Sequence, residues 1–90
     1  MKIIKTAVAG TLESSDALVE VAPAASVTVE IESAVFAQFG ESIEQSVREV
    51  LAQFDVNGAA VRVTDRGALD CTIRARVETA IKRGAKEATK

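Results

Sequence analysis

Apolar and polar residues alternate along the first third of this 90-residue chain, the pattern of strands with one buried face. A short apolar run at 3–9 predicts a first strand, which Gly10 ends. A second strand is predicted at 17–22, because the alternation stops at Pro23, a residue that cannot donate to a sheet. Alternation resumes at 26–32. The compact turn between these last two runs predicts that they pair as a hairpin.

The apolar spacing then changes to the period of three and four residues that is typical of amphipathic helices. The first predicted helix carries its apolar stripe at Phe39, Ile43, Val47, Val50, Leu51 and Phe54. Ser42 and Gln45 have the spacing of a capping box, and Asn57-Gly58 ends the helix. A second helix is predicted to start at Asp70, a plausible N-cap. Its stripe is Leu69, Ile73, Val77, Ala80 and Ile81.

An alternating run at 59–64 lies between the two helices and predicts a fourth strand, followed by a turn at Asp65-Arg66-Gly67. The predicted order is strand, strand, strand, helix, strand, helix. Strands and helices are mixed without strict alternation, which favours an α+β fold. We therefore expect one domain over residues 1–90, with a small antiparallel or mixed sheet of about four strands and two helices packed on one face.

The composition argues against an enzyme and against a metal site. The chain has no His, the commonest general base and metal ligand, and no glycine-rich loop of the kind that binds phosphates. Cys71 falls in the first turn of the second predicted helix, where a thiolate is stabilised, but a lone cysteine is more often a small buried apolar residue. One cysteine excludes an intrachain disulfide. With no signal peptide and no apolar run long enough to span a membrane, we expect a cytoplasmic protein.

Charge is divided unevenly within a net charge of −2. Residues 1–57 hold three basic and nine acidic groups, whereas residues 58–90 hold eight basic and four acidic groups. The basic groups suit the C-terminal end of a helix. Nucleic-acid binding is disfavoured, because the whole chain is acidic and lacks aromatic residues on which bases would stack.

The loop at residues 10–16 is the best candidate for carrying chemistry. It places the hydroxyls of Ser14 and Ser15 between two apolar runs, beside the acidic residues Glu13 and Asp16. A carrier protein needs an exposed nucleophile, local backbone freedom and few competing reactive groups, and the acidic neighbours suit a basic transferase surface. An ordinary turn accounts for the same residues. Local chemistry does not distinguish Ser14 from Ser15.

Two long runs resemble a known family. The run from Lys2 to Asp16 is similar to the N-terminus of the acyl carrier (gamma) subunit of bacterial citrate lyase. The run from Gly67 to Glu78 resembles the second signature of that family, and the segment from Phe36 to Asn57 also fits. The resemblance covers nearly the whole chain at matching length.

The resemblance implies a non-catalytic carrier with Ser14 as its covalent attachment site. In that family the serine holds a phosphoribosyl dephospho-coenzyme A group through a phosphodiester, and the terminal thiol of the group carries an acetyl. The alpha subunit exchanges acetyl for citryl, and the beta subunit cleaves citryl to oxaloacetate and regenerates the acetyl carrier. The implied partners are these two subunits, in a hetero-oligomeric complex, and the holo-carrier transferase.

Two arginines of the second predicted helix suggest a further role. Arg74 and Arg76 are candidates for contacts with the phosphates of the attached group or with an acidic surface of a lyase partner. The alternative is that they lie on a solvated helix face.

Two other functions remain open. One is the carrier subunit of malonate decarboxylase, which uses a similar prosthetic group; the two long runs favour citrate lyase. The other is a small non-enzymatic interaction or regulatory domain with an unmodified serine loop.

Overall fold

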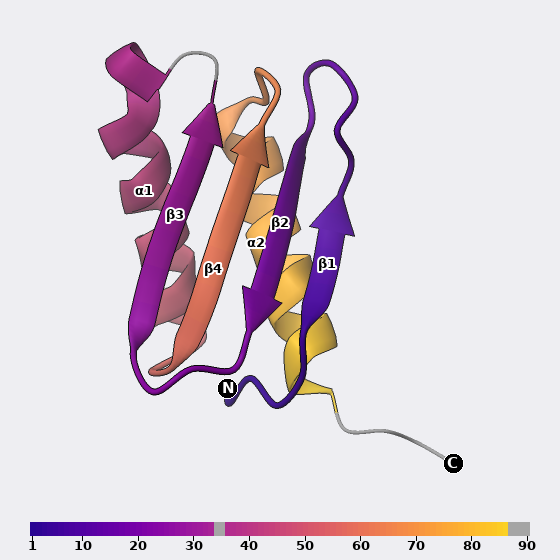
Figure 1. Ribbon diagram of the computed structural model, residues 1–90, viewed down its shortest axis with the longest axis vertical. Coiled ribbons are helices and arrows are strands. Elements are labelled where there is room, and N and C mark those ends of the chain that lie inside the picture. Colours follow the sequence, from indigo (N-terminus) through magenta and orange to yellow (C-terminus); the bar gives the residue numbers. More distant parts are fainter. Residues whose placement is uncertain (34–35, 87–90) are drawn as a thin grey trace.

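Four strands form one mixed sheet, and two helices lie against one of its faces (Figure 1). This computed structural model describes residues 1–33 and 36–86. The elements in chain order are β1 (Ala7–Gly10), β2 (Ala17–Ala22), β3 (Val27–Ser33), α1 (Phe36–Gln53), β4 (Ala59–Asp65) and α2 (Asp70–Ala85). Both the predicted element order and the predicted α+β class are confirmed.

The sheet has the order β1-β2-β4-β3, so the fourth strand lies between the second and the third. β2 pairs with β4 antiparallel, whereas β3 pairs with β4 parallel. The predicted hairpin between residues 17–22 and 26–32 is therefore wrong. The chain runs from β3 through α1 to β4, the crossover that a parallel pair requires. The alternating pattern identifies the buried face of a strand but not the strand beside it. Val63 of β4 lies opposite Val19 of β2 on one side and Ile31 of β3 on the other, and all three follow the same pattern.

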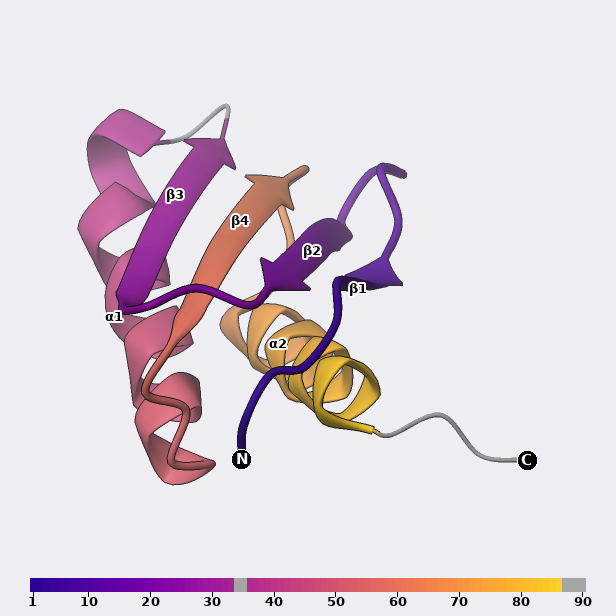
Figure 2. The same cartoon turned by 60° about the horizontal axis from the view of Figure 1, so that its bottom comes forward.

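The core lies between the sheet and the two helices. α2 contacts β1 and β2, while α1 contacts β3 and α2, and Figure 2 shows both helices on the same side of the sheet. The largest fully buried side chains are Val19, Val21, Val47, Val63, Val77 and Ile81. The other face of the sheet is open, and there Arg62 forms an exposed ion pair with Glu30 at 3.1 Å.

The helical stripes are mostly buried as predicted, except at their N-terminal ends. Phe39 is 52% exposed and Leu69 is 71% exposed, because both lie where a helix begins and reaches beyond the sheet. α1 begins at Phe36, so the predicted capping box at Ser42 and Gln45 is wrong: both residues lie inside the helix.

The start of α2 also differs from the prediction. Leu69 occupies the N-cap position with no side-chain cap, and Asp70 is the first helical residue. The Asp70 carboxylate instead accepts hydrogen bonds from the Ser46 hydroxyl and from Nε of Arg74, at 2.8 Å for the latter. Cys71 is exposed rather than buried, because it lies off the stripe that faces the core.

The N-terminal segment forms a shorter strand than the predicted 3–9. The backbone N–H groups of Ile4 and Lys5 donate to the carbonyl oxygen of Gly84, at 2.9 and 3.2 Å. They thus satisfy a carbonyl of the last turn of α2, which has no partner within the helix. The strand consequently starts only at Ala7 and includes Gly10.

Candidate functional site

The two candidate serines form the tip of a tight turn between β1 and β2. The Asp16 N–H donates to the carbonyl oxygen of Glu13 at 3.2 Å, which makes Ser14 and Ser15 the central residues of the turn. Both serines are exposed, and neither hydroxyl has a hydrogen-bond partner within the described ranges. The loop therefore presents two free nucleophiles to solvent.

The backbone distinguishes the two serines, which local chemistry did not. Ser15 has a φ of 67°, a left-handed conformation that is uncommon outside glycine, and its N–H donates to the carbonyl oxygen of Arg66 at 2.8 Å. Ser14 has neither feature. The main chain of Ser15 is therefore fixed against the turn that follows β4, while Ser14 occupies the outer corner.

The Asp16 carboxylate points inward rather than toward a partner. It accepts hydrogen bonds from Thr11 Oγ1 and the Ala17 N–H, both at 2.7 Å, and from Nε and Nη2 of Arg76, both at 3.0 Å. These bonds, that of Arg76 above all, hold the pKa of Asp16 well below its usual range. Asp16 is therefore already paired within the chain, and of the two acidic neighbours only Glu13 is exposed. Recognition of either residue by a transferase stays a prediction.

Both arginines singled out from the sequence have partners within the chain. Arg76 binds Asp16 across 60 positions of sequence. Arg74 binds Glu49 of α1 and Asp70 of its own helix. These bonds raise the pKa of Arg74 and lower that of Glu49, whereas the pKa of Asp70 is lowered first by the Ser46 hydroxyl and then by Arg74. Both side chains are still 38% to 40% exposed, so the alternative of a solvated helix face stays open. Contact of either arginine with a phosphate or a partner stays a prediction.

Gly10 allows the two ends of the serine loop to approach each other. Its φ is 93°, and a Cβ built there would lie 1.8 Å from the carbonyl oxygen of Ala17 and 3.2 Å from Cδ of Arg76. Only glycine fits this position. The loop is thus closed at its base by main-chain contact and covered there by the arginine stem.

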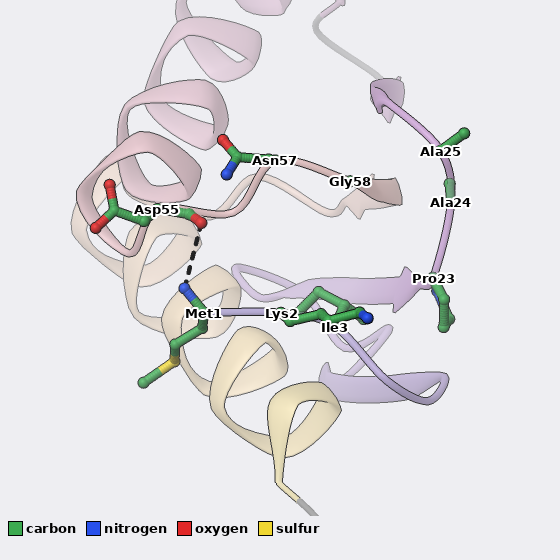
Figure 3. A pocket seen from close by; sticks show the side chains of 9 residues that line it. All are labelled: Met1, Lys2, Ile3, Pro23, Ala24, Ala25, Asp55, Asn57 and Gly58. Carbon is green, nitrogen blue, oxygen red and sulfur yellow. Dashed lines mark hydrogen bonds between the residues drawn. The ribbon is translucent and has the colours of Figure 1, made fainter.

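A hollow at the far end of the molecule does not belong to this site. It is lined by Met1, Lys2, Ile3, Pro23, Ala24, Ala25, Asp55, Asn57 and Gly58 (Figure 3). The Met1 amine donates there to the carbonyl oxygen of Asp55 at 3.2 Å. This end of the sheet lies opposite the β1–β2 loop in Figure 1, and the lining holds no hydroxyl or thiol nucleophile.

The described part of the chain holds no candidate metal site and no candidate membrane-spanning helix. Among residues 1–33 and 36–86, no three His, Cys, Asp or Glu side chains come together as metal ligands. Within the same ranges, neither helix has the length and apolar character to cross a bilayer.

Comparison with known proteins identifies the family. Residues 4–84 match the family model of acyl carrier proteins described as malonate decarboxylase delta subunit (MdcD). A citrate lyase acyl carrier protein of Haemophilus ducreyi is 53% identical over 88 residues, which are 98% of this chain and 93% of that protein. Citrate lyase acyl carrier protein 2 of Salmonella typhimurium is 52% identical over 89 residues, covering 97% and 92%.

The chain belongs to the citrate lyase acyl carrier protein family. Its members are acyl carrier proteins, as the resemblance implied, and thus non-catalytic subunits. The fold has a solved counterpart in a Pseudomonas malonate decarboxylase hetero-tetramer in complex with malonate. One chain of that structure superposes with a TM-score of 0.75 at 20% identity, over 90% of this chain and 84% of the other.

The fold brings together the two runs that carry the family resemblance. The serine loop closes the first run, and Arg76, which holds that loop, lies in the second. The sequence analysis missed this contact and the backbone bonds from Arg66. No sequence spacing signals either one, since both join segments that meet only through the sheet.

Proposed function

We propose that this carrier protein holds a phosphoribosyl dephospho-coenzyme A group on Ser14 and serves citrate cleavage. The observation that carries the proposal is the exposed Ser14 hydroxyl at the corner of a fixed turn, in a chain of the citrate lyase carrier family. In the attachment, Oγ of Ser14 forms a bond to phosphorus of an activated phosphoric anhydride donor. The hydroxyl proton is lost, the anhydride leaving group departs, and a phosphodiester remains.

The residues around Ser14 suit a phosphodiester. Of the two carboxylates that flank the serines, Asp16 is already paired with Arg76, and Glu13 is exposed, so that solvent screens its charge from the phosphodiester. Arg76 binds Asp16 through Nε and Nη2, and its Nη1 has no hydrogen bond to the described residues. When bound, the group supplies a thiol on a long arm that carries acetyl and citryl as thioesters.

The carrier's part in the reaction is to tether the acyl group. An arm attached to one chain brings its thioester to two active sites at high effective concentration, without release into solvent. In the proposed cycle the alpha subunit exchanges acetyl for citryl, and the beta subunit releases oxaloacetate and restores the acetyl thioester. This chain would work in the cytoplasm, as a subunit of a hetero-oligomeric complex loaded by a holo-carrier transferase.

Intact-mass measurement tests the attachment site. We expect the chain co-expressed with its holo-carrier transferase to gain a single adduct of the mass of the group. Ser14→Ala should show the bare mass, and the matched variant Ser15→Ala should keep the adduct. An adduct on Ser14→Ala would show that another residue is the attachment site. A bare mass for the unaltered chain with active transferase would favour the unmodified interaction domain.

A further inference from the structure

The Asp16 carboxylate ties both ends of the serine loop to a helix. Thr11 precedes the turn and Ala17 follows it, and both donate to this carboxylate at 2.7 Å. Arg76 of α2 donates to both carboxylate oxygens with two nitrogens of one guanidinium, each at 3.0 Å. We call Asp16 and Arg76 the loop clamp. It fixes the position of Ser14 relative to α2.

The carboxylate of the clamp is more buried than those of the other ion pairs among the described residues. The Asp16 side chain is 14% exposed, whereas the other carboxylates in ion pairs are 44% to 71% exposed. A planar guanidinium that binds a carboxylate through two parallel bonds also fixes its orientation, which a lysine does not achieve. Main-chain bonds reinforce the clamp, because Arg66 exchanges two hydrogen bonds with Ser15 and Asp16, at 2.8 and 2.9 Å.

We propose that Asp16 and Arg76 are positioning residues that hold Ser14 in the form accepted by the transferase that modifies it. This inference rests on the proposed function. A segment already ordered in its bound shape avoids the entropic cost of ordering at the moment of binding. The loop also has two serines in succession, so its main chain must be held in one orientation if the transferase is to modify one hydroxyl and not the other.

A direct contact of Arg76 with a phosphate is the competing role, and the two roles predict different couplings. If Arg76 acts through Asp16, removal of either residue breaks the same clamp, and the double variant is no worse than the single ones. If Arg76 binds phosphate itself, the losses multiply, and Arg76→Lys, which keeps the positive charge, retains most of the rate.

The experiment measures the initial rate of adduct formation on the full unmodified chain, with purified transferase and its donor, as the carrier concentration is varied. For Arg76→Ala we expect kcat/KM to fall about tenfold, mostly through a higher KM for the carrier. Arg76→Lys and Asp16→Asn should lose nearly as much, and the double variant no more. Thr11→Val removes one exposed bond to Asp16 and should show a smaller loss.

Arg62→Ala is the matched control. It removes an arginine whose exposed ion pair with Glu30 lies on the open face of the sheet and not at the serine loop, so we expect wild-type kcat/KM. Amide hydrogen exchange should show faster exchange at Ser15 and Asp16 in Arg76→Ala but not in Arg62→Ala. Thermal unfolding of each variant checks that it is folded at the assay temperature.

Two outcomes would overturn the positioning role of Asp16 and Arg76. The first is a wild-type kcat/KM for both Arg76→Ala and Asp16→Asn. The second is a double variant whose loss equals the product of the two single losses, together with an active Arg76→Lys. If Arg76→Ala does not fold, the test uses Thr11→Val, at an exposed position, and Asp16→Asn. A wild-type kcat/KM for both of these variants would then overturn the positioning role. A failure of the proposed function looks different: the unaltered chain would gain no adduct, or Ser14→Ala would still gain one.

Discussion

At the scale of single residues, the two adjacent serines have different surroundings. Ser15 takes the third position of the Glu13–Asp16 turn, where φ is positive, and its N–H is bound to Arg66. Ser14 lies at the preceding position, outside the left-handed region. One serine thus bears a conformational cost while the other does not, although their side chains are identical.

This difference predicts opposite effects of glycine at the two positions. Ser15→Gly should raise the free energy of unfolding by about 0.5–1 kcal/mol, because glycine adopts a positive φ without steric penalty. Ser14→Gly should lower it by a few tenths of a kcal/mol, since glycine there only adds freedom to the unfolded chain. Chemical denaturation measures both values.

The same pair of variants also bears on function. Ser15→Gly should still accept the adduct, because it keeps Ser14 and the turn. If Ser15→Gly proved less stable than Ser14→Gly, the assignment of strain to Ser15 would be wrong.

At the scale of elements, the connections at the far end of the sheet place β4 between its neighbours. The turn before β4 passes close to the segment that joins β2 to β3: a Cβ built on Gly58 would lie 2.3 Å from the carbonyl oxygen of Ala24. The N–H of Ala59 donates to the carbonyl oxygen of Ser26 at 3.2 Å. The start of β4 therefore lies against the segment that joins β2 to β3. Gly58 makes this close approach of the two main chains possible, because it has no side chain.

Gly58→Ala should lower the free energy of unfolding by about 1–3 kcal/mol, because main chain and not a flexible side chain opposes the new methyl group. Gly67→Ala is the comparison: its φ is 87° but a Cβ there meets nothing within 4 Å, so its cost of about 1 kcal/mol is conformational alone. Thermal or urea unfolding separates the two. A Gly58→Ala variant as stable as the unaltered chain would contradict the close approach.

At the scale of the whole molecule, three carboxylates connect separate elements. Asp16 joins the serine loop to α2 through Arg76, Glu49 of α1 binds Arg74 of α2, and Asp70 of α2 accepts a hydrogen bond from Ser46 of α1. The pKa of each is lowered in the folded chain, chiefly by the hydrogen bonds of these arginines and, for Asp70, first by that of Ser46. The contacts between helices and loop therefore depend on the ionised state of these groups.

Acid should consequently weaken the fold. Each of the three carboxyl groups binds protons more readily when unfolded, so its contribution is complete above the unfolded pKa near 4 and is lost as pH falls through the lower folded pKa. We expect the melting temperature to be steady from pH 7 to about pH 5 and to decline below it. Asp16→Asn should flatten that decline, whereas Glu30→Gln, on an exposed pair of the open face, should not. Equal slopes for all three chains would contradict this linkage.

The amino-acid sequence alone predicts the order of the elements and most of their buried faces, and the structure confirms both. Alternation and helical spacing depend on which side of an element meets the core, and this is written in neighbouring residues such as Val19 and Val21, or Val47 and Leu51. The exclusion of catalysis followed from residue types alone. The resemblance named Ser14, which the structure shows exposed at the corner of its turn.

The pairing of the strands and the contacts that hold the serine loop are evident only in the folded chain. The insertion of β4 between β2 and β3, and the bonds from Arg76 and Arg66 to the loop, join segments separated by tens of residues. The predicted N-cap at Asp70 is also wrong, because its carboxylate binds Ser46 of α1 and Arg74 of the next turn of α2 rather than an N–H group at the start of its own helix. Local patterns report burial and propensity, but partners distant in sequence are chosen by how the layers pack.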